Sequence, residues 1–216
     1  NTVQIPEKDR FLYPEANKSF EYFANVIHLS DKHLPLLFEG LEKRGLLENT
    51  IVIITGDHSR SAISGSKVSF NQTGFNSDIF QVPFLMIWKG VIPEMRLTDI
   101  AYSQMDIAPT VLDVLRLPVK DHHFQGKSII ADSLDNDVFL VQPYNGIYLS
   151  IINYPYKYGK HLETGKEFLF NIINDPYEKN NIINNHKNVH QSFIPKLNYI
   201  YNTSSLIESN KVWIKK

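Results

Sequence analysis

The stretch NTIVIITGDHS, residues 49–59, decides the expected fold of this chain. Residues 51–54 form a continuous β-branched apolar run, which is typical of a strand buried on both faces in a parallel sheet. The run is followed by Gly56, Asp57 and His58. In open α/β sheets ligands bind beyond the carboxyl ends of strands, so two polar side chains stand where such a site is expected.

Asp57 and His58 offer a carboxylate oxygen and an imidazole nitrogen side by side. Both groups suit a divalent metal such as zinc or manganese. The alternative is a polar turn that ends the strand, in which Asp57 caps backbone amides. Two ligands do not close a site, because zinc takes about three or four. The residues alone leave both interpretations open.

The segments around this stretch alternate helical and strand patterns. Apolar residues recur at three- and four-residue spacing from Phe20 to Leu41, which predicts a helix, and Gly45 stands where its C-cap would be. Residues 82–88 indicate a second buried strand. Residues 103–115 predict a helix whose start is capped or oriented by Asp106.

The later part of the chain is richer in strands. Residues 138–142, 147–153 and 167–172 read as short strands separated by turn signals, and residues 187–206 as a final helix. We therefore predict an α/β sandwich with a mostly parallel central sheet flanked by helices, followed by a small C-terminal antiparallel sheet. We assign residues 1–135 to the α/β core and 136–216 to a strand-rich subdomain with a terminal helix.

The composition excludes several classes of protein. Of the 216 residues 43% are hydrophobic, including 13 Phe and 11 Tyr, so the chain can fill a core. A formal net charge of −1 gives no basic field for nucleic acid. The absence of cysteine excludes disulfides, zinc–thiolate sites and cysteine nucleophiles. We interpret the start at Asn1, without Met, as a cut chain, so a missing leader or membrane anchor carries no weight.

Five motifs in a fixed order resemble the alkaline phosphatase/sulfatase superfamily, which includes sulfatases and lipoteichoic-acid-synthase-like phosphoglycerol transferases. The resemblance covers roughly residues 20–183. The motifs are FANVIHLSDKHLPLLFEGLEKRGLLENTIVIITGDHS (23–59), VPFLMIWKG (82–90), SQMDIAPTVLDVLRLP (103–118), FQGKSII (124–130) and LFNIINDPYEKNNI (169–182). The ordered set identifies the chain as similar to the C-terminal part of an alkaline-phosphatase-like enzyme.

The resemblance implies roles for a few residues. The Asp and His of the family's DH motif are metal ligands, which implies a divalent metal (Mn, Zn, Ca or Mg) on Asp57 and His58. The family often has a His or Lys before the Val-Pro strand, and Lys67 or Asn71 could take that substrate-binding place; the simpler interpretation is a solvated loop. Ser59 replaces the Gly that usually follows DH.

No catalytic residue is assigned within the chain. The family's nucleophile is a Thr or Ser in phosphotransferases and a formylglycine in sulfatases, and it is expected upstream of Asn1. A rival metal motif, Asp121-His122-His123, resembles the DHH of another phosphoesterase class. That class places it after an apolar strand, whereas here it follows LRLPVK, and we interpret it as an exposed linker.

The function implied is that of the C-terminal portion of a metal-dependent sulfatase or phosphoglycerol transferase, acting on sulfate or phosphate esters. The fragment itself is expected to be inactive. The resemblance also implies an extracytoplasmic location, periplasmic or at the cell surface, with a membrane anchor upstream. The alternative is a degenerate, non-catalytic sulfatase-like binding module, and the oligomeric state is not predicted.

Overall fold

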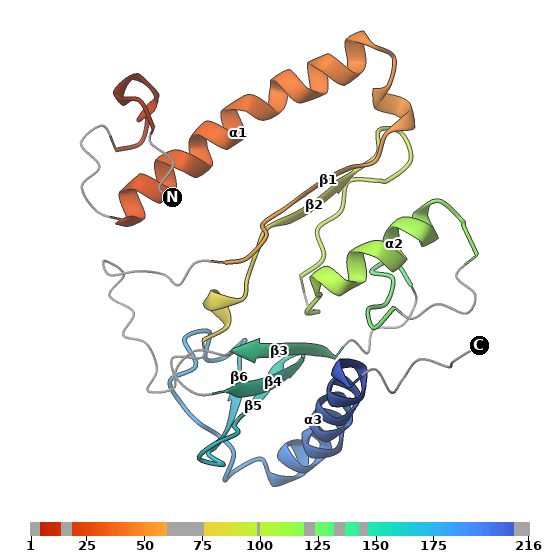
Figure 1. The fold of residues 1–216 in the computed structure, drawn as a ribbon. Coiled ribbons are helices and arrows are strands. Elements are labelled where there is room, and N and C mark those ends of the chain that lie inside the picture. The colour runs from red at the N-terminus through yellow and green to blue at the C-terminus, as the bar shows by residue number, and fades with distance from the viewer. Residues whose placement is uncertain are drawn as a thin grey trace. The chain divides into compact units, whose positions relative to one another are not determined.

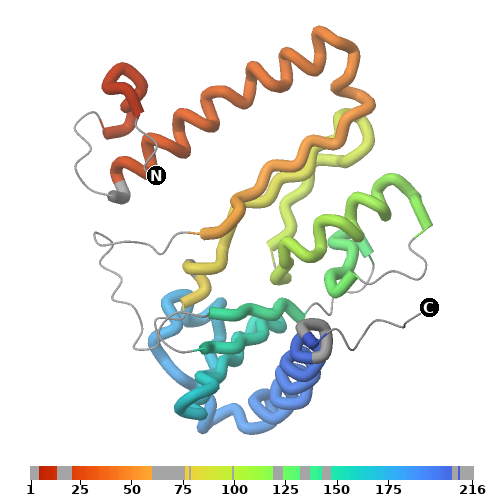
Figure 2. The backbone as a smooth tube through the Cα atoms, viewed as in Figure 1, coloured from red at the N-terminus to blue at the C-terminus, as the bar shows by residue number. Residues whose placement is uncertain are grey.

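The structure is a computed structural model that describes residues 5–13, 19–59, 76–98, 100–118, 124–131, 137–142 and 147–209 (Figures 1 and 2). Its contacts divide the chain into two compact units. The first unit is Asn1–Phe70 with Asn76–Met95, and the second is Asn71–Phe75 with Arg96–Lys216. The sequence-based boundary between residues 135 and 136 stays a prediction.

The first unit contains the long helix α1 (Ser19–Lys43) and the strands β1 (Val52–Thr55) and β2 (Phe84–Ile87). Helix α1 ends as predicted at Gly45, whose φ is 66°. The Gly45 N–H donates to the carbonyl of Glu42, and the Leu46 N–H donates to that of Leu41. This is a Schellman motif, which needs the left-handed conformation that glycine adopts without strain.

The two strands of the first unit pair antiparallel, with Val52 opposite Ile87 and Thr55 opposite Phe84. The sequence predicts a mostly parallel central sheet, whereas the two strands described in this unit are antiparallel. A β-branched run reports that both faces of a strand are covered, but it carries no information on the direction of the neighbour. Phe84 and Leu85 are also 38% and 48% exposed, so β2 is less buried than expected.

Side chains fasten the segments of the first unit together. Trp88 Nε1 donates to the carbonyl of Glu48 over 2.7 Å, which joins the end of β2 to the turn before β1. Asn25, only 1% exposed, accepts the N–H groups of Leu12 and Tyr13 on Oδ1 and donates from Nδ2 to the Tyr13 carbonyl. One buried amide thus satisfies three backbone groups of the N-terminal segment, as a buried polar group requires.

The second unit begins with helix α2 (Ile107–Val114), which follows the short 3-10 helix Gln104–Asp106. Asp106 is 2% exposed and accepts the N–H of Ser103 on Oδ2 and that of Lys127 on Oδ1. The predicted capping role of Asp106 is confirmed. The same carboxylate also holds the following loop, where a Cβ on Gly126 would lie 2.1 Å from the Met105 carbonyl oxygen.

A four-stranded antiparallel sheet forms the rest of the second unit, with helix α3 (Lys187–Glu208) against one face (Figure 1). The order β3-β4-β5-β6 follows the chain, and the predicted C-terminal antiparallel sheet is confirmed. The strands are β3 (Val138–Gln142), β4 (Tyr148–Asn153), β5 (Tyr156–His161) and β6 (Glu167–Asn171). Side chains from the sheet and from α3 make the core, namely Ile151, Tyr158, Leu169, Phe193 and Leu197.

The NDPYEKNN segment after β6, residues 174–181, makes hydrogen bonds and an ion pair that fix its backbone against the sheet. Asp175 accepts the Asn180 N–H on Oδ2, and Asn181 accepts the Leu169 N–H on Oδ1. Glu178 forms a buried ion pair with Lys157 of β5. The motif therefore pins the chain that leads from the sheet to α3.

Candidate metal site

Asp57 and His58 lie two and three residues beyond the end of β1, as the sequence predicts. Their side chains are 89% and 80% exposed. Asp57 Oδ1 accepts the backbone N–H of His58 over 2.9 Å, so the carboxylate also serves as the turn cap that was the alternative interpretation. Its second oxygen, Oδ2, lies 3.7 Å from His58 Nε2. The two side chains converge.

The backbone fixes which nitrogen of His58 is available. Nδ1 lies 2.8 Å from the carbonyl oxygen of Ser59. Because a carbonyl can only accept, Nδ1 carries the proton in the neutral ring and Nε2 carries the lone pair. Metal-ligating histidines commonly have this arrangement, in which a carbonyl holds the ring on its far side.

The geometry of the pair fits a single divalent ion. Two ligands at ~2.1 Å from a tetrahedral ion lie roughly 3.4 Å apart, close to the 3.7 Å between Oδ2 and Nε2. Carboxylate oxygen and neutral imidazole are accepted by zinc and manganese alike. The donor set therefore suits the metal that the sequence predicts, although it supplies only two ligands.

The lack of a side chain on Gly56 allows Val82 to lie close to the backbone next to Asp57 and His58. A Cβ on Gly56 would lie 3.3 Å from a methyl carbon of Val82 and 3.5 Å from the His58 carbonyl oxygen. Ser59 Oγ is buried and has no hydrogen-bond partner within the described part of the chain. A buried polar atom without a described partner beside Asp57 and His58 is an exception that calls for an explanation, and a group bound there would supply one.

Other predicted site residues lie outside the described residues, namely Lys67, Asn71 and the Asp121-His122-His123 motif. Their predicted roles stay predictions. Within the described ranges no group of three or more His, Asp or Glu side chains could hold a metal. No described helix is both long enough and apolar enough to span a membrane.

Sequence reasoning missed a second polar cluster, in which Glu167 of β6 meets Tyr158, Lys160 and His190. His190 follows Glu167 by 23 residues and lies on another element, so no spacing rule brings them together. Burial alone would raise the pKa of Glu167, but hydrogen bonds from Tyr158 and Lys160, with the charges of Lys160 and His190, lower it. Burial and the bond to Glu167 raise the pKa of Tyr158.

The chain is similar to known proteins along most of its length. The family model Sulfatase matches residues 2–117, more than half of the chain. The endo-4-O-sulfatase of Bacteroides thetaiotaomicron is 27% identical over 188 residues, which cover 74% of this chain and 36% of that protein. Lipoteichoic acid synthase 2 of Bacillus subtilis is 29% identical over 117 residues, covering 51% of this chain and 18% of that protein.

The fold is also shared with solved structures. The crystal structure of Ps i-CgsB superposes with a TM-score of 0.72 at 17% sequence identity, covering 91% of this chain and 46% of that one. The predicted α/β fold of the alkaline-phosphatase-like kind is thereby confirmed. The chain spans about a third of the length of the first curated relative. On the family match and this shared fold, the chain belongs to the sulfatase family.

Proposed function

We propose that this chain is the C-terminal portion of a metal-dependent enzyme that acts on sulfate esters, or on phosphate esters as the phosphoglycerol transferases do. The observation that carries the proposal is the convergence of Asp57 Oδ2 and His58 Nε2, 3.7 Å apart beyond the end of β1. Family membership supports the reaction class, and the relatives favour sulfate esters over phosphate esters.

In the proposed mechanism the residues of this chain hold and orient a divalent metal ion. Asp57 would bind a divalent ion through Oδ2 while Oδ1 stays engaged with the His58 N–H. His58 would bind through Nε2, with its ring held by the Ser59 carbonyl. When bound, a divalent ion would supply positive charge that stabilises the charge developing on the transferring group. The nucleophile is not assigned to this chain, and we propose that residues 1–216 alone are inactive.

Metal binding tests the ligand assignment directly. The protein is stripped with a chelator and titrated with Mn²⁺, Zn²⁺, Ca²⁺ and Mg²⁺ in a calorimeter. We expect Asp57→Asn and His58→Gln each to weaken the preferred ion by about 10²-fold, since even the loss of an outer hydrogen bond to a ligand costs about 10- to 100-fold. Asp31→Asn is the matched control, because Asp31 is an exposed carboxylate on α1. Equal affinity in Asp57→Asn and Asp31→Asn would rule out the site.

A second candidate is a non-catalytic sulfatase-like module. It is favoured by the high exposure of Asp57 and His58, and by the lack of a third acidic or histidine ligand near them within the described ranges. The protein expressed from its native gene is assayed with an aryl sulfate and with a phosphodiester. Turnover of either ester supports the enzyme, whereas metal binding without turnover supports the module.

The location of the protein is proposed from the family alone. We propose an extracytoplasmic position, periplasmic or at the cell surface, with attachment to a membrane through a segment outside the described residues. Fractionation of cells that express the native gene tests this. Recovery of the protein with cytoplasmic markers would contradict it.

A further inference from the structure

The two proposed metal ligands present different donor atoms. Asp57 has one oxygen left for an ion, Oδ2, because Oδ1 accepts the His58 N–H over 2.9 Å. His58 has the nitrogen Nε2, because Nδ1 lies 2.8 Å from the carbonyl oxygen of Ser59. The pair therefore offers one carboxylate oxygen and one ring nitrogen, 3.7 Å apart.

This donor set disfavours calcium and magnesium. Ca²⁺ takes about six to eight oxygen ligands and often binds both oxygens of a carboxylate. One oxygen of Asp57 is already engaged with a backbone N–H, and the neighbouring donor is a nitrogen. Mg²⁺ also binds oxygen atoms and keeps several of its waters. Neither ion gains affinity from an imidazole.

The same donor set suits zinc. Zn²⁺ binds histidine nitrogen and carboxylate oxygen together, usually with about four ligands in all. Imidazole is a good ligand for zinc, whereas Mn²⁺ stands at the weak end of the affinity order for such sites. The Ser59 carbonyl also holds the His58 ring with Nε2 free before an ion arrives, an arrangement common among metal-ligating histidines.

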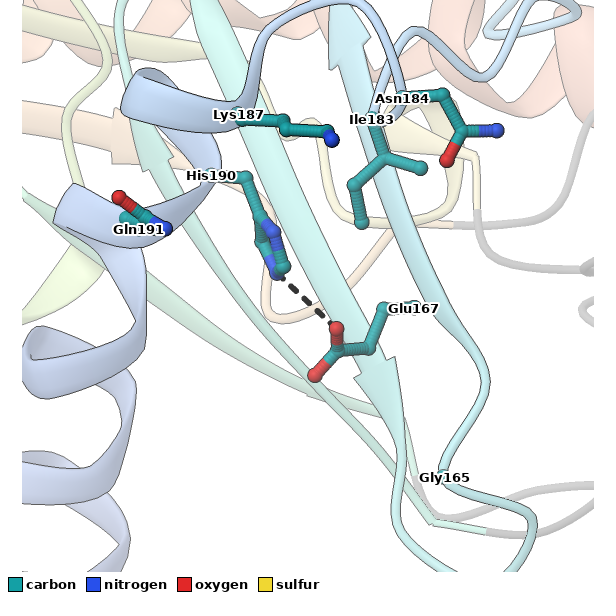
Figure 3. A pocket seen from close by; sticks show the side chains of 7 residues that line it. All are labelled: Gly165, Glu167, Ile183, Asn184, Lys187, His190 and Gln191. Atoms are coloured by element: carbon teal, nitrogen blue, oxygen red, sulfur yellow. Dashed lines mark ion pairs between the residues drawn. The ribbon is translucent and has the colours of Figure 1, made fainter.

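A second carboxylate–histidine contact among the described residues shows what sets the proposed metal ligands apart. His190 Nε2 lies 3.0 Å from Glu167 Oε2, and Figure 3 shows the ring directed at that carboxylate. Glu167 Oε1 accepts the Tyr158 hydroxyl over 2.9 Å and lies 3.2 Å from Lys160 Nζ. An ion there would have to displace existing partners beside a lysine charge. The side chains of the proposed metal ligands, in contrast, are 80% and 89% exposed.

From this donor set we propose that His58 makes the site selective for zinc over calcium and magnesium. The proposal rests on the proposed function, since it presupposes that Asp57 and His58 bind a metal ion. His58 is then the ligand that determines which ion binds, because its nitrogen favours zinc, whereas an oxygen at the same position would favour calcium. Asp57 supplies negative charge that attracts any divalent cation.

Competition titrations measure this selectivity without an assay of activity. The protein expressed from its native gene is stripped with a chelator and titrated with Zn²⁺, Ca²⁺ and Mg²⁺. We expect Zn²⁺ to bind at least about 100-fold more tightly than Ca²⁺. His58→Asn replaces the ring nitrogen by an amide oxygen, so the ratio of zinc to calcium affinity should fall about tenfold or more. Asp57→Asn should weaken both ions and leave zinc preferred.

His33→Asn is the matched control for zinc bound adventitiously by surface histidines. His33 is exposed, and its Nδ1 also lies against a backbone carbonyl, that of Leu29, over 2.6 Å. It forms no ion pair with a carboxylate of the described residues. This variant should keep the zinc-to-calcium ratio of the original protein. An equal fall in the ratio for His33→Asn and His58→Asn would refute the proposal.

The outcomes separate this proposal from the metal site itself. Absence of binding by every ion would refute the metal site, and the selectivity with it. Calcium binding as tight as zinc binding in the original protein would leave the metal site standing and refute the selectivity. An unchanged ratio in His58→Asn would do the same for the role of that residue.

Discussion

Lys157 Nζ lies 2.9 Å from Glu178 Oε2, and the two side chains are only 1% and 0% exposed. The pair joins β5 to the turn that follows β6. Two charges so far from water are held by their mutual attraction, which must offset the cost of removing both from solvent. Either charge without the other should therefore be costly to the second unit.

Removing one partner should destabilise the second unit strongly. Glu178→Met removes the carboxylate that faces the buried Lys157 ammonium, and we expect the free energy of unfolding to fall by about 3–5 kcal/mol. The double variant Lys157→Met/Glu178→Met should recover most of this loss, because no charge remains buried. Urea denaturation followed by circular dichroism measures both. A double variant no more stable than Glu178→Met would show that the residues contribute independently.

Gly126 should tolerate no side chain. A Cβ there would lie 2.1 Å from the Met105 carbonyl oxygen and 2.7 Å from the Asp106 nitrogen, both backbone atoms that cannot rotate away. We expect Gly126→Ala to lower stability by about 2–3 kcal/mol, in the range of overpacked sites. Gly40→Ala is the control, since Gly40 lies inside α1 and its nearest neighbour is the flexible end of Arg44. That change should stabilise α1 slightly.

The lowered pKa of Glu167 predicts how the stability of the second unit changes at low pH. Burial opposes ionisation, but the bonds from Tyr158 and Lys160 and the charges of Lys160 and His190 prevail, so the folded-state pKa lies below the unfolded one. The stability that Glu167 contributes is present above the unfolded pKa, about 4.5, and is lost as the pH falls through the folded pKa.

Comparison of two Gln variants isolates this contribution. Glu167→Gln should lose stability at pH 6 relative to the original protein, and the difference should shrink as the pH falls toward 3. Glu163→Gln, at an exposed position in the neighbouring turn, should show no such pH-dependent difference. Thermal melts at several pH values give the measurement. A constant difference at every pH would mean that Glu167 acts through packing rather than charge.

The proposed ligands make a prediction about turnover. In the protein from its native gene, Asp57→Asn should lower kcat/KM for a sulfate ester by about 10²-fold or more, because one metal ligand loses its charge. Asp31→Asn should keep full activity. Excess metal in the assay should partly restore the Asp57→Asn variant if the defect is one of affinity. Full activity of Asp57→Asn without added metal would contradict the assignment.

Local features of this fold were predictable from sequence. Gly45, Asp106 and the position of Asp57 and His58 each follow from rules that involve residues within a few positions of one another. Three of the four C-terminal strands were also predictable, because turn signals separate short apolar runs. Strand β5 (Tyr156–His161) was missed, because its sequence YKYGKH contains no apolar run.

Features that join distant residues were not predictable. The direction in which β2 runs beside β1 depends on pairing across 28 residues, and the apolar runs of both strands read alike in either direction. The Ser59 carbonyl that orients the His58 ring is a backbone group. Every residue has such a carbonyl, so the sequence does not show which one contacts His58. Glu167 and His190 meet only because α3 packs across the sheet.

The plain succession of β3, β4, β5 and β6 has a consequence for how the chain acquires its structure. Every neighbouring pair in that sheet is also consecutive along the polypeptide, so each pairing closes only a short loop and carries a small entropic penalty. Topologies dominated by such near-neighbour contacts fold quickly. The C-terminal sheet can thus form one hairpin at a time. Pairing of β1 with β2 instead has to close a longer loop.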